Sequence, residues 1–113
     1  MAVRFLIIGG GPAGNTAATH AARLGADVTI VEREIIGGAA HLWDCIPSKT
    51  MIATGGAMAF GRRSSGMGLE EMRPEVDVEA LTDRIEDIKE HLSQSTTNLL
   101  RSQGVRLITG SAR

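Results

Sequence analysis

The chain has 113 residues, and its 12 basic and 13 acidic side chains leave a formal charge of −1 and a pI near 6.3. This balance gives no electrostatic reason to expect nucleic acid or an anionic membrane surface as a partner. With 42% apolar residues, a core is possible and wholesale disorder is excluded. No apolar run approaches the roughly 18 residues of a transmembrane segment, and the start lacks the features of a secretory signal. The single cysteine excludes an internal disulfide, so we expect a cytoplasmic protein.

The first third of the chain predicts a strand, a helix and a second strand. The apolar run Val3–Ile8, followed by three glycines, is typical of a buried parallel strand. Pro12 suits the first turn of a helix, and the small residues over 13–24 favour a helix that packs closely on a sheet. Residues 27–31 predict a second buried strand, with Glu32 at its carboxyl end.

The remaining chain predicts two helices and a third strand. After a loop over 37–40, residues 46–60 favour a helix, which a pair of consecutive glycines weakens. Residues 61–74 predict an exposed connection. Asp77 is suited to cap a long helix that ends before Gly104, and 105–109 predict the third strand. The apolar positions expected on the core-facing side of that helix are Val78, Leu81, Ile85, Ile88, Leu92 and Leu99.

This alternation of strands and helices predicts an α/β fold with a Rossmann-like, doubly wound parallel sheet. Three strands do not complete such a sheet, and they leave an apolar edge open. We therefore expect residues 1–113 to form the N-terminal portion of one domain in a larger protein.

The glycine motif Gly9–Gly14 joins the first strand to the first helix and matches G-x-G-x-x-G. Gly9 allows the tight turn, Gly11 lets the backbone approach a pyrophosphate, and Gly14 allows close helix–strand packing. Glu32 follows Gly14 by 18 residues, and its carboxylate can accept hydrogen bonds from ribose hydroxyls. The pattern favours NAD or FAD over a plain glycine turn with a surface glutamate.

Residues 37–49, GGAAHLWDCIPSK, resemble the signature of the flavoprotein disulfide reductases, also called pyridine nucleotide-disulfide oxidoreductases. This family includes dihydrolipoamide dehydrogenase, glutathione reductase and the soluble transhydrogenase. The resemblance implies a glutathione-reductase-type FAD-binding domain. It also implies that NAD(P)H and the NAD(P)-binding and dimerisation domains lie outside these residues, in a homodimeric parent.

The chain departs from the family pattern at the redox-active thiols. Ala40 stands where the family has its first cysteine, and Ala39 replaces a threonine whose hydroxyl faces the FAD phosphates. Only Cys45 remains, and a disulfide needs two sulfurs about 2 Å apart. The usual disulfide relay is therefore excluded at this site. The pattern is most similar to the NAD(P)H–quinone reductase branch of the family.

The resemblance also implies roles for individual residues. Cys45, at a helix N-terminus that favours thiolate, is a candidate electron donor in contact with the flavin; the alternative is a buried, inert cysteine. Lys49 matches a family lysine that stabilises the reduced flavin; the alternative is a solvated helix lysine. The full set assigned to FAD binding is Gly9, Gly11, Pro12, Ala13, Gly14, Glu32, Arg33, Gly37, Gly38, Ala39, Ala40, Cys45, Lys49 and Ala112.

The implied reaction passes electrons from NAD(P)H through FAD to a quinone-like small molecule, and the 113 residues alone are expected to be inactive. Two alternatives stay open: a dihydrolipoamide dehydrogenase-type enzyme with thiols elsewhere, and a non-catalytic nucleotide-binding fragment. No metal site is predicted, because the three histidines, His20, His41 and His91, lack metal-ligand spacing.

Overall fold

The computed structural model describes residues 1–113 and confirms the predicted α/β fold. Its three strands form one sheet in the order β1-β2-β3, and both pairings are parallel. The elements in chain order are β1 (Arg4–Ile8), α1 (Pro12–Arg23), β2 (Asp27–Glu32), α2 (Gly38–Leu42), α3 (Cys45–Arg63), the 3₁₀ helix η1 (Ser64–Met67), α4 (Val78–Ser102) and β3 (Arg106–Thr109).

The core lies between one face of the sheet and the helices α1 and α4. Ala18 of α1, Val28 and Ile30 of β2, and Leu100 of α4 are nearly or fully inaccessible to solvent and form one cluster. The small side chains of α1 let this helix approach the central strand closely. The cluster therefore holds the carboxyl ends of the strands in one place.

The prediction that the first strand is buried is wrong for this chain. Leu6 and Ile8 are each 66% exposed, whereas Ile7 between them packs against the core. β1 is an edge strand, and the helices cover only one of its two faces. Alternate side chains are left exposed on the other face, because successive residues of a strand point to opposite sides.

The helical segments extend further than predicted. Residues 38–40, expected to be part of a loop, belong to the short helix α2, and α3 runs through Gly55 and Gly56 to Arg63. A glycine costs a helix only about 1 kcal/mol relative to alanine. Two of them do not outweigh the hydrogen bonds of a 19-residue helix.

The connection over 61–74 is mostly exposed, as predicted, and its buried residues are Gly61 and Ser64. Ser64 is fully buried, and its Oγ lies 2.7 Å from the carbonyl oxygen of Gly61 and 3.1 Å from that of Glu70. The ring of Pro74 packs over the α-carbon of Gly61. These contacts fold the connection back on the end of α3.

Asp77 caps α4 as predicted, since its carboxylate accepts a 2.9 Å hydrogen bond from the N–H of Ala80. The predicted apolar stripe of α4 is only partly correct. Ile85 is buried, but Val78 is 70% and Leu99 53% exposed. Val78 lies in the first turn of α4, at the end far from the sheet, and at the other end Leu100 rather than Leu99 takes the buried position.

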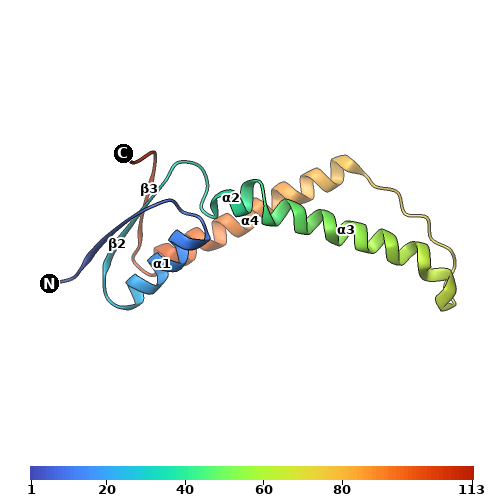
Figure 1. Cartoon of the computed structure of the whole chain (residues 1–113), viewed down its shortest axis with the longest axis horizontal. Helices are drawn as coiled ribbons and strands as arrows, with labels where there is room; N and C mark the ends of the chain where they lie inside the picture. Colours follow the sequence, from blue (N-terminus) through green and yellow to red (C-terminus); the bar gives the residue numbers. More distant parts are fainter.

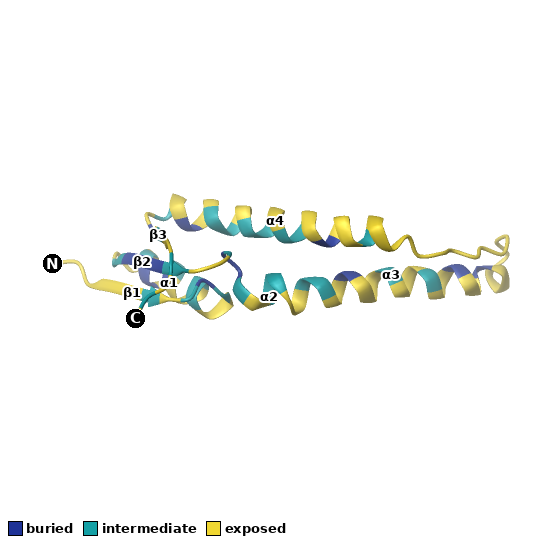
Figure 2. Ribbon diagram, turned by 90° about the horizontal axis from the view of Figure 1, so that it is seen from above, coloured by how far each residue is buried: buried dark blue, intermediate teal, exposed yellow.

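The molecule is elongated, with extents of 67 × 26 × 18 Å and a Cα radius of gyration of 19.5 Å. A compact chain of this length would have a radius near 13 Å. Figures 1 and 2 show the reason: α3 and α4 run side by side away from the sheet as a helical hairpin. None of the helices combines the length and apolarity required to span a membrane.

Candidate functional site

The glycine turn between β1 and α1 lies at the carboxyl end of the sheet. Gly9 has φ of +103°, a conformation that favours glycine, and its N–H donates a 2.8 Å hydrogen bond to the carbonyl of Val31. A Cβ on Gly14 would overlap the carbonyl group of Gly9, whereas a Cβ on Gly11 would meet nothing within 4 Å. Gly14 therefore permits the packing, and Gly11 leaves open space beside the helix N-terminus.

The carboxylate of Glu32 is held by two backbone groups. Its Oε2 accepts a 2.7 Å hydrogen bond from the N–H of Gly10, and its Oε1 accepts one of 2.8 Å from the N–H of Glu34. The main-chain carbonyl of Glu32 accepts a further bond of 2.9 Å from Gly110. Glu32 thus connects the glycine turn, the end of β2 and the segment after β3.

The same contacts determine the charge of Glu32. Partial burial raises the pKa of its carboxyl, but hydrogen bonds from the backbone of Glu34, Gly10 and Arg33 and the positive charge of Arg33 outweigh that effect. The net result is a pKa below the ordinary value of 4.5. Glu32 is therefore a carboxylate at neutral pH, which accepts hydrogen bonds and repels a phosphate.

A second glycine pair packs against the first turn. The N–H of Gly37 donates a 2.8 Å hydrogen bond to the carbonyl of Gly10. A Cβ on Gly38, whose φ is +57°, would lie 3.0 Å from the Cα of Gly11. The structure therefore brings together the two glycine segments that the sequence singled out separately.

A cavity of about 250 Å³ opens beside these groups, at the ends of all three strands. Ligands of open parallel sheets bind at this edge of the sheet, beyond the carboxyl ends of the strands. The cavity is lined by Ile8, Gly9, Val31, Glu32, Arg33, Gly110, Ser111 and Ala112. Four residues predicted to bind the cofactor therefore share one cavity, although they come from distant parts of the sequence: Gly9, Glu32, Arg33 and Ala112.

The residues predicted for the flavin side lie elsewhere. Cys45 is the first residue of α3 and is exposed. Lys49 is exposed one turn further along α3, and Ala39 and Ala40 belong to α2. None of these four side chains lines the cavity beside Glu32.

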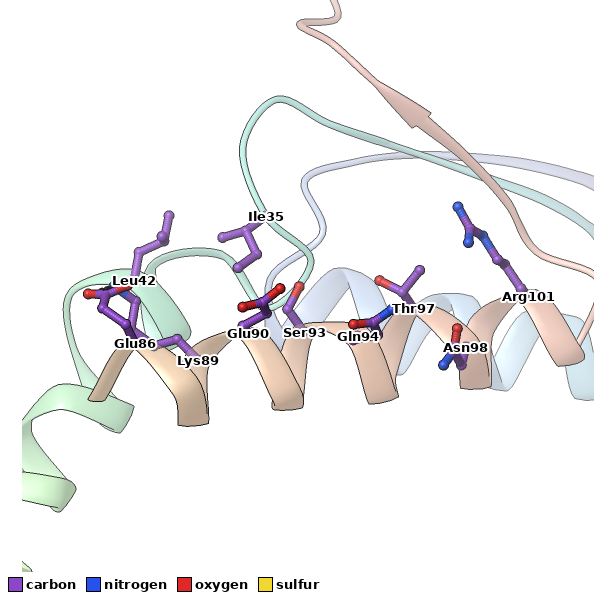
Figure 3. A pocket seen from close by; sticks show the side chains of 10 residues that line it. All are labelled: Ile35, Leu42, Glu86, Lys89, Glu90, Ser93, Gln94, Thr97, Asn98 and Arg101. Carbon is purple, nitrogen blue, oxygen red and sulfur yellow. Dashed lines mark hydrogen bonds and ion pairs between the residues drawn. The ribbon is translucent and has the colours of Figure 1, made fainter. Parts of the chain in front are cut away.

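Three larger cavities contain none of the predicted site residues, and the smallest of them, of about 300 Å³, lies between α1 and α4. One, of about 420 Å³, follows the polar side of α4, where Arg101 and Thr97 extend toward β3 and Ile35 lies opposite (Figure 3). The third, of about 530 Å³, is mostly apolar and lies between β1 and α1. No group of three or more His, Cys, Asp or Glu side chains is placed to hold a metal ion.

Sequence reasoning missed Gly10, the second of the three consecutive glycines. It is buried, and a Cβ there would lie 2.8 Å from the Cδ1 of Ile36 and 3.2 Å from the Cβ of Glu32. The motif requires glycine only at its first, third and sixth positions. The presence of glycine at the second position was the one signal available.

Comparison with known proteins agrees with this geometry. Residues 3–113 match the family described as pyridine nucleotide-disulphide oxidoreductase. The chain is 36% identical over 108 residues to dihydrolipoyl dehydrogenase 2 of Haloarcula marismortui, covering 96% of this chain and 23% of that protein. It is also 36% identical over 115 residues to an NAD(P)H dehydrogenase (quinone) of Mycobacterium tuberculosis, covering 97% of this chain and 23% of that protein.

A solved structure, LpdA of Mycobacterium tuberculosis, superposes with a TM-score of 0.87 at 37% identity and covers 96% of this chain and 24% of LpdA. The chain thus spans about a quarter of the length of the proteins it matches. The family match covers nearly all of these residues, and the glycine turn, Glu32 and the parallel sheet agree with it. The chain therefore belongs to the pyridine nucleotide-disulphide oxidoreductase family.

Proposed function

We propose that this chain provides the FAD-binding portion of an oxidoreductase that passes electrons from NAD(P)H through FAD to a quinone-like acceptor. The observation that supports it most is the cavity at the strand ends, where the glycine turn meets a carboxylate that two backbone N–H groups hold in place. A glycine turn, a helix N-terminus and an acidic residue in this arrangement suit the adenosine diphosphate half of a dinucleotide.

The residues present fit that half of FAD. Gly11 leaves room for a pyrophosphate at the N-terminus of α1, and Pro12 there removes no hydrogen bond. Glu32 would accept hydrogen bonds from the ribose hydroxyls, and the backbone near Ala112 would lie against the adenine. Once bound, FAD supplies the ability to take up a hydride and release its electrons singly or in pairs.

We assign Cys45 and Lys49 to contact with the flavin half of FAD. Cys45 is the first residue of α3, at the N-terminal end of that helix. Lys49 lies one turn further along the same helix, so both side chains lie on one side of α3. A positive charge from Lys49 would stabilise negative charge on a flavin.

The acceptor is inferred from the missing thiol. Ala40 replaces the first cysteine of the family motif, and Cys45 is the only cysteine in these residues. With no dithiol at this site, electrons must leave the flavin directly for a molecule that reaches it. One relative in the comparison is named a quinone dehydrogenase, which supports this choice.

A second candidate is an enzyme of the dihydrolipoyl dehydrogenase type with thiols elsewhere in a longer chain, since other relatives have that name. A non-catalytic nucleotide-binding module is the third. The homodimeric parent and the cytoplasmic location stay predictions.

Anaerobic titration of the protein as its own cell makes it, with NADH followed by a soluble quinone, tests the proposal. We expect a bound flavin that is fully reduced by one equivalent of NADH and reoxidised by the quinone. Two equivalents would indicate a second redox centre and favour the dihydrolipoyl dehydrogenase type. Cys45→Ser should leave the count at one equivalent, because a single thiol cannot store a second electron pair as an internal disulfide. A protein without flavin would overturn the proposal.

A further inference from the structure

The polar groove along α4, with a volume of about 420 Å³, contains none of the residues assigned to FAD. The helix α4 supplies its polar side chains, and Ile35 and Leu42 form the apolar wall on the other side (Figure 3). A second cavity, of about 230 Å³, adjoins this groove at Thr97 and Arg101 and extends to Leu107 of β3. The groove therefore continues along α4 as far as the sheet.

The groove has one unpaired charge of each sign. Arg101 has no acidic side chain within ion-pair distance, and Glu90 has no basic one. The third and fourth charged groups in the groove neutralise each other, because the Nζ of Lys89 lies 2.7 Å from the Oε1 of Glu86. A ligand would thus meet a free cation and a free anion in the same groove.

The two carboxylates that line the adjoining cavity do not neutralise Arg101. Glu32 accepts hydrogen bonds from the N–H groups of Gly10 and Glu34, and the carboxylate of Glu34 lies 3.6 Å from the Nε of Arg33. Both carboxylates therefore already have partners, and the guanidinium of Arg101 stays available for an anionic group of a ligand.

The spacing of the two free charges suits an extended peptide. Arg101 and Glu90 are 11 residues apart on one helix. At 1.5 Å per residue they are about 16 Å apart along the helix axis. An extended peptide advances roughly 3.3 Å per residue, so about five residues cover this distance. Between the two charges, Gln94 and Asn98 line the groove with amide groups, which donate and accept hydrogen bonds as peptide groups do.

We propose that the groove along α4 is a docking site for an extended segment of a partner protein, about five residues long, with an acidic side chain at one end and a basic one at the other. The acidic side chain pairs with Arg101, whose guanidinium matches a carboxylate in shape, and the basic one pairs with Glu90. Ile35 and Leu42 cover an apolar side chain between them. Exposed ion pairs are individually weak and screened by salt, so binding should be weak and should decrease as salt is added.

Fluorescence anisotropy with three labelled, end-capped peptides tests this proposal on the protein in the longest form its cell makes. The peptide EALAK has one acidic and one basic end, EALAE has two acidic ends, and KALAK has two basic ends. We expect the wild type to bind EALAK about threefold more tightly than either of the others, because each of those loses one ion pair. Arg101→Glu should bind KALAK most tightly, and Glu90→Lys should bind EALAE most tightly.

Two variants on the same helix are the matched controls. Arg84→Glu and Asp87→Lys make the same changes of charge outside the groove, so both should keep the wild-type order of affinities. The unfolding temperature of each variant shows that it is folded. No binding of EALAK, no preference among the peptides, or an unchanged order in Arg101→Glu would overturn the docking site. Each of these results leaves the FAD proposal intact, because the flavin titration does not depend on this groove.

Discussion

Glu32 shows how one side chain connects segments that are far apart in the sequence. Its carboxylate accepts hydrogen bonds from Gly10 and Glu34, and its carbonyl accepts one from Gly110. Each of these backbone N–H groups would otherwise lack a partner at the end of a strand or turn, where no ladder continues. The residue proposed to recognise the ligand therefore also holds the segments of the site together.

Glu32 should make the stability of the protein depend on pH in the acid range. Its folded-state pKa lies below the ordinary 4.5, so between these values the unfolded chain binds more protons than the folded one. The stabilisation is therefore complete above about pH 4.5 and is lost as the pH falls through the folded-state pKa. Denaturant unfolding of wild type and Glu32→Gln across this pH range measures the stabilisation that the Glu32 carboxylate provides.

The quantity to compare is the difference in the free energy of unfolding between wild type and Glu32→Gln, because the other carboxyl groups titrate in both proteins. We expect this difference to shrink as the pH falls, since protonation removes the advantage of the wild-type carboxylate. Two stability curves that stay parallel from neutral to acid pH would contradict a native-state role for the Glu32 charge.

At the scale of elements, α3 and α4 begin differently. The carboxylate of Asp77 accepts the N–H of Ala80 at the start of α4, whereas Asp44, before α3, makes no such side-chain bond. An N-cap oxygen pairs a backbone N–H that has no partner within the helix. The start of α4 is therefore determined locally, and the start of α3 depends on its packing against α2.

Asp77→Ala should destabilise the protein by about 1 kcal/mol, the usual cost of losing an N-cap. Thermal or denaturant unfolding measures it. Asp77→Asn keeps an acceptor oxygen and should recover most of the loss. Asp44→Ala is the matched control and should have a smaller effect, because no cap hydrogen bond is removed. Equal losses in Asp77→Ala and Asp44→Ala would contradict this account of the two helix starts.

At the scale of the whole molecule, only 14 of 113 residues are buried, and the main apolar cluster lies at the sheet end. The helical hairpin of α3 and α4 extends away from that cluster, and its connecting segment leaves Leu69, Met72 and Val76 exposed. The two ends of the molecule should therefore differ in local stability.

Amide hydrogen exchange on the 113-residue chain measures that difference. The amides of β2, which pairs with strands on both sides, should be the slowest to exchange. The amides of residues 68–77, which have no regular secondary structure, should exchange fastest. Equal protection of the two regions would contradict this order and would indicate that the hairpin is covered, for example by a second copy of the chain.

Local patterns in the sequence were sufficient for much of the site. The spacing of Gly9, Gly11 and Gly14 and the position of Glu32 predicted the turn and its acidic partner, because both are properties of a short βαβ unit. Asp77 was predicted as a cap for the same reason. Gly10 could not be assigned, since its constraint comes from Ile36 and Glu32, which are more than 20 residues away.

Local sequence patterns specify the three strands and the approximate positions of α1, α3 and α4, and they also specify which residues lie at the carboxyl ends of the strands. Periodicity, caps and glycine turns act over a few residues, so these features do not depend on the rest of the fold. Three features of the fold follow from tertiary contacts instead. β1 lies at an edge of the sheet, and α3 continues through its glycines. Gly37 and Gly38 pack on the first glycine turn. These outcomes depend on contacts between segments distant in the chain, which no local pattern specifies.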